Sequence, residues 1–345
     1  MPVGCVNPAD MMGQTVRDKG RAARPSVPTR QAIVRLLQAA VTAPSMHNTQ
    51  PWRFHYREAD QTIELYADPA RTLPHADPQG RAVHIACGAA LFNLRLAIAV
   101  SEREPVVRLL PRGHEPLLLA TVRLAGRYRP GETERELFAV IGERHTNRNP
   151  FSDRPVPTGV LAELVEAARL EGAALHILGQ AAAERVLSLT AAADRLQRDQ
   201  PGYRSELAKW TGGQRDRDGI PASAFGPRVA DGSLPLRDFT LGLPPGDASY
   251  ARFEASPQLA VLSTRFGSRA DWLRAGQALQ RLLLLATARG VAVGHLTQGL
   301  ETADAWLIRD PGSGIEHPQM VLRLGYGTAA HPSPRRPVSE VLDGP

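Results

Sequence analysis

The sequence predicts an α+β protein in which one unit of helices and strands occurs twice. Three pairs of segments carry this prediction, because the apolar residues follow the same pattern within each pair. The helical spacing of residues 33–40 returns at 161–168, that of 88–94 returns at 276–282, and the strand pattern of 120–125 returns at 320–325. Three resemblances in the same order predict an internally duplicated chain whose copies pack as a pseudo-dimer, with any site at the seam.

The first copy is expected at residues 28–130. Apolar residues at helical spacing predict a helix at 33–41, which must end by Ala43 because the residue before a proline avoids the helical conformation. Alternation of apolar and polar residues then predicts strands. The remaining elements are strands at 52–56 and 62–67, a loop at 68–80, a long buried helix at 81–100, and strands at 106–110 and 117–124.

The second copy is expected at residues 131–345. It has predicted helices at 132–143 and 160–168, a strand at 173–178, a helix around 276–282 and a closing strand at 320–325. An insertion at about 180–255 interrupts it, with helices at 181–196 and 203–210 followed by a stretch rich in glycine and proline. Such a segment is a lid, a binding loop or a disordered region, and the aromatic residues Trp210, Phe225 and Phe239 favour a lid.

Composition narrows the class of protein. The chain has 345 residues, of which 43% are hydrophobic and 22% charged, as in ordinary globular proteins. Residues 1–27 lack periodicity and are expected to form a flexible leader. No apolar run reaches the roughly 18 residues of a membrane span, so a soluble, cytoplasmic protein without a membrane partner is expected. Two cysteines and scattered histidines give no zinc spacing, so no metal site is expected.

The positive charge does not indicate nucleic acid. The net charge is +6, yet Lys19 and Lys209 are the only lysines, and the arginines are spread along the chain without a dense block. Scattered arginines usually belong to a solvated surface. The chain also lacks the alternating basic and aromatic residues of a nucleic-acid module.

Two loops are unusually rich in polar side chains. Residues 45–50 carry five hydrogen-bonding side chains in six positions between a predicted helix and a predicted strand. Taken alone, this loop fits either a capped turn or a loop that holds donors and acceptors against a polar aromatic ligand. Residues 144–151 form the second loop, which contains two arginines, a histidine, a threonine and two asparagines.

These loops carry a resemblance to a known family. Ala43-Pro44-Ser45, Asn48 and Gln50-Pro51-Trp52 resemble the APSxxNxQPW signature of the nitroreductase flavoproteins. Arg144-His145-Thr146-Asn147-Arg148 with Phe151 resembles the arginine motif of the same family. Two such halves in one chain, with the arginine motif second, are similar to the Acg family. The resemblance covers roughly residues 28–342 and implies a nitroreductase-like fold.

The resemblance implies one FMN between the two halves. The first half would contribute Pro44, Ser45, Met46, Asn48 and Gln50, and the second half would contribute Arg144, His145, Thr146, Arg148, Leu296, Thr297, Gln298, Gly299, Arg335 and Arg336. Guanidinium groups suit the FMN phosphate, and hydroxyl and amide side chains suit the polar edge of the isoalloxazine. No catalytic side chain is expected, since the flavin carries the electrons.

The expected function is that of an FMN-dependent oxidoreductase acting on a small electron-poor organic substrate. The alternative is an FMN-sequestering or storage protein of the Acg type, in which the insertion covers the flavin and there is little NAD(P)H-dependent turnover. The use of NAD(P)H stays open, as does the choice between a monomeric pseudo-dimer and a homodimer.

Overall fold

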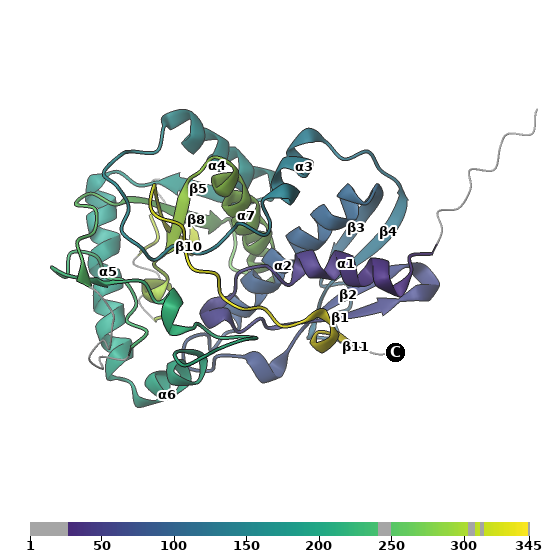
Figure 1. Ribbon diagram of the computed structural model, residues 1–345, viewed down its shortest axis with the longest axis horizontal. Helices are drawn as coiled ribbons and strands as arrows, with labels where there is room; N and C mark the ends of the chain where they lie inside the picture. The colour runs from purple at the N-terminus through teal and green to yellow at the C-terminus, as the bar shows by residue number, and fades with distance from the viewer. Residues whose placement is uncertain (1–26, 241–249, 303–307, 311–313, 344–345) are drawn as a thin grey trace, which may run out of the picture.

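The computed structural model describes residues 27–240, 250–302, 308–310 and 314–343. The expected leader at 1–27 therefore lies outside the described residues except for Val27, and so do residues 241–249 of the insertion. The described chain forms two α+β units side by side, with helices α2 and α7 at their junction (Figure 1).

The first unit has the order helix, two strands, helix, two strands. Its first helix begins after Thr29, whose side chain accepts a hydrogen bond from the Ala32 amide, and its second helix is buried along most of its length. The elements are α1 (Arg30–Ala40), β1 (Trp52–Arg57), β2 (Thr62–Ala67), α2 (Arg81–Val100), β3 (Arg103–Leu109) and β4 (Leu118–Arg127). These bounds follow the sequence predictions closely.

The second unit repeats this order. After a short helix α3 (Glu132–Ala139), it consists of α4 (Thr158–Leu170), β5 (Ala174–Ile177), β8 (Gln258–Thr264), α7 (Arg269–Ala288), β9 (Ala292–His295) and β10 (His317–Gly325). The strands run β1-β2-β4-β3 in one sheet and β5-β8-β10-β9 in the other, and every neighbouring pair is antiparallel. Two units with one topology confirm the predicted duplication.

Two glycines let the central helices of the units touch. A Cβ atom on Gly88 of α2 would lie 2.3 Å from the Leu273 carbonyl oxygen, and one on Gly276 of α7 would lie 2.1 Å from the Ile85 carbonyl oxygen. The contact is reciprocal, as an interface between two copies of one unit requires. Helix α2 is apolar and long enough to cross a membrane by composition alone, but 89% of its most apolar window is buried, and it forms part of the core.

Replacing Gly88 with alanine is expected to destabilise the protein. The new methyl group would meet backbone atoms, so the two helices would have to separate, at a cost of about 1–3 kcal/mol in unfolding free energy. Urea unfolding would measure this loss. Gly159→Ala in α4 is the matched control, since a Cβ there meets nothing within 4 Å, and it should leave stability unchanged or slightly raised.

The end of the chain returns to the first unit. After β10 the chain crosses the junction (yellow in Figure 1) and ends in β11 (Leu342–Asp343), which pairs with β1 in parallel. The Phe54 amide donates to the Val341 carbonyl at 2.7 Å. We call residues 326–341 the C-terminal arm. The predicted second half thus supplies an edge strand to the sheet of the first half.

The insertion lies between β5 and β8, where the first unit has only the short turn Glu58–Asp60. It comprises α5 (Gln180–Asp199), α6 (Pro201–Trp210) and an irregular stretch with the short strands β6 (Arg228–Val229) and β7 (Tyr250–Ala251). Tyr203 and Leu207 of α6 pack against Leu73 and Ala76 of the first unit. The described part of the insertion is therefore attached to both units, as a cover would be.

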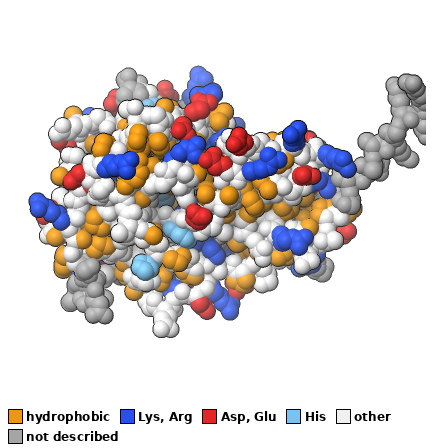
Figure 2. All heavy atoms as spheres, turned by 45° about the horizontal axis from the view of Figure 1, so that its top comes forward, with side chains coloured by type: hydrophobic (Ala, Val, Ile, Leu, Met, Phe, Trp, Pro, Cys, Tyr) orange, Lys and Arg blue, Asp and Glu red, His pale blue; other side chains and the backbone are white. Residues whose placement is uncertain are grey.

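The surface charge agrees with the sequence. Figure 2 shows basic and acidic side chains interspersed over one face of the molecule, as the scattered arginines predict.

Helix α3 is shorter than predicted. It ends at Ala139 and not at residue 143, because the chain turns there to carry Arg144 inward. The Arg144 amide donates to the Val140 carbonyl, which closes this turn.

Candidate functional site

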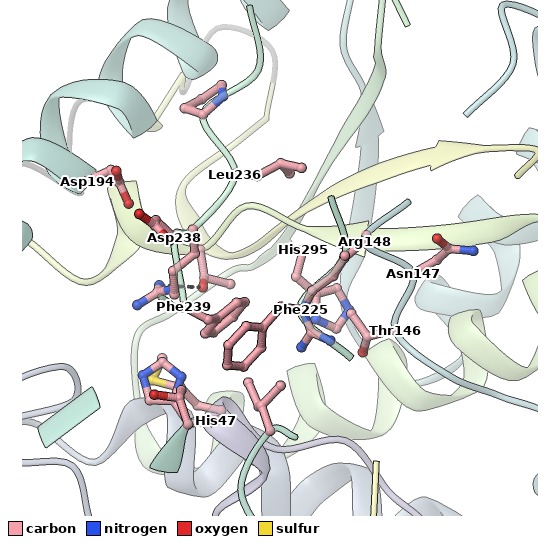
Figure 3. Close-up of a pocket in the computed structure, with 18 of the residues that line it drawn as sticks. His47, Thr146, Asn147, Arg148, Asp194, Phe225, Leu236, Asp238, Phe239 and His295 are labelled. Carbon is pink, nitrogen blue, oxygen red and sulfur yellow. Dashed lines mark hydrogen bonds between the residues drawn. The ribbon is translucent and has the colours of Figure 1, made fainter. Parts of the chain in front are cut away.

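A cavity of about 1300 Å³ lies where the two units and the insertion meet (Figure 3). The first unit contributes Pro44–His47 and the start of α2, and the second contributes Thr146–Asn149 together with Gly294, His295 and Thr297. Residues of the insertion complete the wall. A smaller cavity adjoins it and shares Pro44, Ser45, Thr146 and Arg148 with it.

The loop between α1 and β1 has a strained backbone. His47, Asn48 and Gln50 all have positive φ angles of 50–55°, a conformation that non-glycine residues adopt rarely. The Ser45 hydroxyl accepts a hydrogen bond from the Gln50 amide at 2.9 Å, which closes the loop on itself. The Ser45 hydroxyl thus closes the loop as a whole and does not cap the short helical turn Met46–Asn48, while Pro44, Ser45, Met46 and His47 line the large cavity.

Arg144 and Arg335 come from opposite ends of the second half and meet in the small cavity. Both guanidinium groups donate to one acceptor, the Thr42 carbonyl, at 3.1 Å each. The Nε atoms of both side chains are buried and have no hydrogen-bond partner among the described residues. Arg335 also donates through Nη1 to the Asn48 side-chain oxygen and to the Ser333 and Pro334 carbonyls. All these acceptors are neutral, and the two Nε donors are left available for an anion.

Burial lowers the pKa of these arginines. The pKa of Arg144 falls to about 9 because the charge is desolvated and because Arg335 lies nearby. Desolvation lowers the pKa of Arg335 to about 10, and desolvation together with Arg237 lowers that of Arg148 to about 10. No described carboxylate raises any of the three values. The site consequently carries positive charge that protein groups do not neutralise.

Arg148 lies at the junction of the site and the insertion. It donates to the Ala224 carbonyl at 2.9 Å, and its guanidinium lies 5.0 Å from the centre of the Phe239 ring. Phe239 stacks on Phe225 with ring centres 5.6 Å apart, and its edge approaches His47. Figure 3 shows both phenyl rings inside the cavity, between the loop of the first half and Arg148.

Two buried histidines in this cavity are neutral. Burial lowers the pKa of His47 to about 3, with a further contribution from Arg237, and burial together with Arg144 and Arg148 lowers that of His295 to about 3. The Nε2 atoms of both rings have no partner among the described residues. At neutral pH these side chains add hydrogen-bonding groups to the cavity without adding charge.

Most of the residues expected to contact FMN line one of the two cavities, and five do not. The small cavity is lined by Pro44, Ser45, Asn48, Arg144, His145, Thr146, Arg148 and Arg335, and the large one by Met46 and Thr297. Neither cavity is lined by Gln50, Leu296, Gln298, Gly299 or Arg336. Leu296 belongs to a hydrophobic cluster, and Gln298 donates to the Pro235 carbonyl at 3.1 Å. Within the segment Leu296–Gly299, Thr297 is therefore the residue placed to contact a ligand.

The insertion supplies cavity residues that no sequence motif identified, among them Asp194, Arg237, Phe225 and Phe239. Arg237 forms a buried ion pair with Glu301 at 2.6 Å, and Glu301 also accepts from Thr297 at 2.7 Å. This pair joins the insertion to the segment after β9. The available signal was the presence of aromatic residues in a stretch otherwise rich in glycine and proline.

Comparison with known proteins identifies relatives over most of the chain. The nitroreductase family model matches residues 17–109 and 141–326. The Mycobacterium tuberculosis protein named "Putative NAD(P)H nitroreductase Rv3131" is 33% identical over 344 residues, which are 97% of this chain and 98% of that protein. The protein of that organism named "Putative NAD(P)H nitroreductase acg" is 30% identical, covering 91% and 96%. A Desulfitobacterium hafniense nitroreductase solved with bound FMN is 15% identical, with a TM-score of 0.38 and coverage of 59% and 95%.

Proposed function

Because this chain belongs to the nitroreductase family, we propose that it binds one FMN between its two halves and exchanges electrons with a small electron-poor organic molecule. The observation that carries this proposal is the pair Arg144 and Arg335. Both are buried, they share the Thr42 carbonyl, and their Nε atoms lack partners within the part of the chain that the structure describes. A phosphate group would accept from both guanidinium groups and neutralise them.

The large cavity suits the flavin ring. Its volume of about 1300 Å³ exceeds the usual range of small-molecule sites, about 300–1,000 Å³. Ser45, Thr146 and Arg148 present hydroxyl and guanidinium groups to it, and Pro44 and Met46 present apolar surface. These residues would bind and orient the ring, with Thr297 as the contact from the segment Leu296–Gly299. The bound FMN would supply the two-electron chemistry, and the insertion would exclude water.

One flavin per chain is expected, because the equivalent place in the second unit is built differently. There the connection between α4 and β5 is only Glu171–Ala173, in contrast to Val41–Pro51 in the first unit. Glu171 forms ion pairs with Arg95 at 2.6 Å and Arg281 at 3.1 Å. Both arginines at this position thus already share a carboxylate partner, in contrast to Arg144 and Arg335, and a second phosphate would have to compete with Glu171 for them.

A second function is favoured by the two phenyl rings in the cavity. Phe225 and Phe239 occupy space beside Arg148, and the Arg237–Glu301 ion pair holds their segment in place. A covered flavin would exchange poorly with NAD(P)H, so the chain would sequester or store FMN. Both functions share the cofactor site and differ in access to it.

The experiment begins with the full-length protein purified in its native state. One FMN released per chain on denaturation supports the cofactor proposal, and a colourless protein that neither contains nor takes up FMN contradicts it. Anaerobic mixing with NADH or NADPH then separates the two functions. Rapid bleaching favours an oxidoreductase, whereas bleaching by dithionite alone favours sequestration.

The preference for FMN over riboflavin is expected to fall as pH rises from 8 to 10. Unbound Arg144 and Arg335 have pKa values of about 9 and 10, so they lose protons in this range. An anion binds the charged guanidinium groups and raises their pKa, and binding is therefore strongest below the unbound values. Riboflavin lacks the phosphate and serves as the control. A ratio of FMN affinity to riboflavin affinity that stays constant up to pH 10 would show that these arginines do not bind the phosphate.

A further inference from the structure

Asn48 is the point where the loop of the first half, the C-terminal arm and the insertion meet. Its side-chain NH₂ group donates to the Gly219 carbonyl at 2.8 Å and to the Pro334 carbonyl at 2.9 Å. Its side-chain oxygen accepts from Arg335 at 3.1 Å. Both hydrogens of the amide are therefore used by protein groups, and Asn48 has no donor left for a ligand.

Gly219 belongs to a turn of the insertion, residues 211–220, that lies against the cavities. The turn is closed by hydrogen bonds between its ends, from Gly212 to the Ile220 carbonyl at 3.0 Å and from Ile220 to the Trp210 carbonyl at 2.8 Å. Thr211, Gly212 and Ile220 line the large cavity, and Ile220 also lines the small one. The position of this turn therefore sets how well the insertion covers the site.

Gln50 makes a parallel connection. Its side chain donates to the Arg217 carbonyl at 2.8 Å in the same turn and accepts from the Arg336 amide at 2.8 Å in the arm. Gln50 is fully buried. Two side chains of one loop thus hold the same two segments, and the backbone amide of Gly219 adds a bond to the Asn48 carbonyl at 3.2 Å.

We infer that Asn48 is a positioning residue that couples anion binding at Arg335 to the seating of turn 211–220 over the cavity. An anion at Arg335 offsets the desolvation of that guanidinium and so stabilises its present position. This position includes the hydrogen bond to Asn48, whose left-handed conformation in turn presents its amide to Gly219. Coupling of this kind is reciprocal, so the seated turn strengthens anion binding by the same factor by which the anion favours the seated turn.

The inference rests on the proposed function only through the anion that Arg335 would bind. Amide hydrogen exchange in residues 211–220 of the full-length chain, stripped of flavin, tests it with FMN as the probe. In the wild type, FMN is expected to slow exchange there at least about fivefold, the lower end of common coupling factors. In Asn48→Ala, FMN should bind about tenfold more weakly and leave exchange in the turn nearly unchanged.

Glu206→Gln is the matched control. Glu206 in α6 accepts from the backbone amides of His75 and Ala76 at 3.0 and 2.9 Å, so it fastens the insertion to the first half without contacting Asn48 or Arg335. This substitution should speed exchange in α6 and keep the effect of FMN on the turn. Equal FMN protection of the turn in the wild type and in Asn48→Ala would overturn the inference.

Asn48→Gly covers the case in which the alanine variant does not fold, because glycine adopts the left-handed conformation of residue 48 freely. It removes the side-chain bonds to Gly219, Pro334 and Arg335, so FMN should again bind more weakly and leave the turn unprotected. If the wild type binds no FMN, the proposed function fails and inorganic phosphate becomes the probe. Phosphate that protects the turn in the wild type and not in the variants would still support the coupling, and phosphate without any effect would overturn it.

Discussion

Replacing Arg144 and Arg335 together with glutamine is expected to weaken FMN binding by about 10²–10⁴-fold. Each guanidinium would form charge-assisted hydrogen bonds with the phosphate, and losing such a bond costs about 1.5–3 kcal/mol, where 1.4 kcal/mol is a factor of ten. Riboflavin binding should change much less, because riboflavin has no phosphate. Fluorescence titration of the stripped protein with both flavins would measure the two affinities.

The stability of the unliganded protein provides the internal control for this double variant. Neither arginine has a carboxylate partner among the described residues, and both charges are desolvated. Their removal should therefore leave the melting temperature of the flavin-free protein unchanged or raised. An equal loss of FMN and riboflavin affinity, accompanied by a lower melting temperature, would indicate a structural role for these arginines and contradict the phosphate assignment.

The second large effect is expected at Glu254. Its carboxylate forms a buried ion pair with Arg323 at 2.6 Å, with side-chain exposures of 4% and 0%, and it also accepts from the Phe151 amide at 2.9 Å. Arg323 lies against the Phe151 ring, 3.8 Å from its centre. Glu254→Gln leaves this cation buried without a counter-charge, and the unfolding free energy should fall by about 3–5 kcal/mol. Chemical denaturation would measure it.

An exposed pair provides the comparison for Glu254. Glu163 interacts with Arg289 at 2.8 Å, but its side chain is 44% exposed, and Glu163→Gln should cost less than about 1 kcal/mol. The Glu254 variant should also bind FMN more weakly, since Arg323 donates to the Asn149 carbonyl at 2.8 Å and so holds the arginine loop. Similar stability losses in the two variants would mean that the Arg323 charge is compensated by other groups.

The sequence was sufficient for the elements whose apolar residues are periodic. The predicted helix at 81–100 is α2, Arg81–Val100, and the predicted strand at 62–67 is β2, Thr62–Ala67. Both are buried through most of their length, so burial and pattern agree. The duplication was visible for the same reason, because Gly88 and Gly276 occupy equivalent places in two apolar helices that touch.

The proposed cofactor site was only partly visible in the sequence. The resemblance brought Arg144 and Arg335 together as candidate phosphate ligands, but their common bond to the Thr42 carbonyl depends on how three distant segments pack. Asn48 and Gln50 were expected to contact the cofactor, and in the structure their amides hold the insertion and the arm. A sequence motif identifies residue types, whereas their partners follow from non-local contacts.

The C-terminal arm and the duplicated units have a consequence for how the site responds to protein concentration. A site built from two separate chains is lost on dilution, since its assembly is bimolecular. Here both walls belong to one polypeptide, and β11 ties the end of the second unit to the sheet of the first. Assembly of the site is therefore a first-order event with a high effective concentration. At trace protein levels, flavin occupancy should depend on free flavin alone.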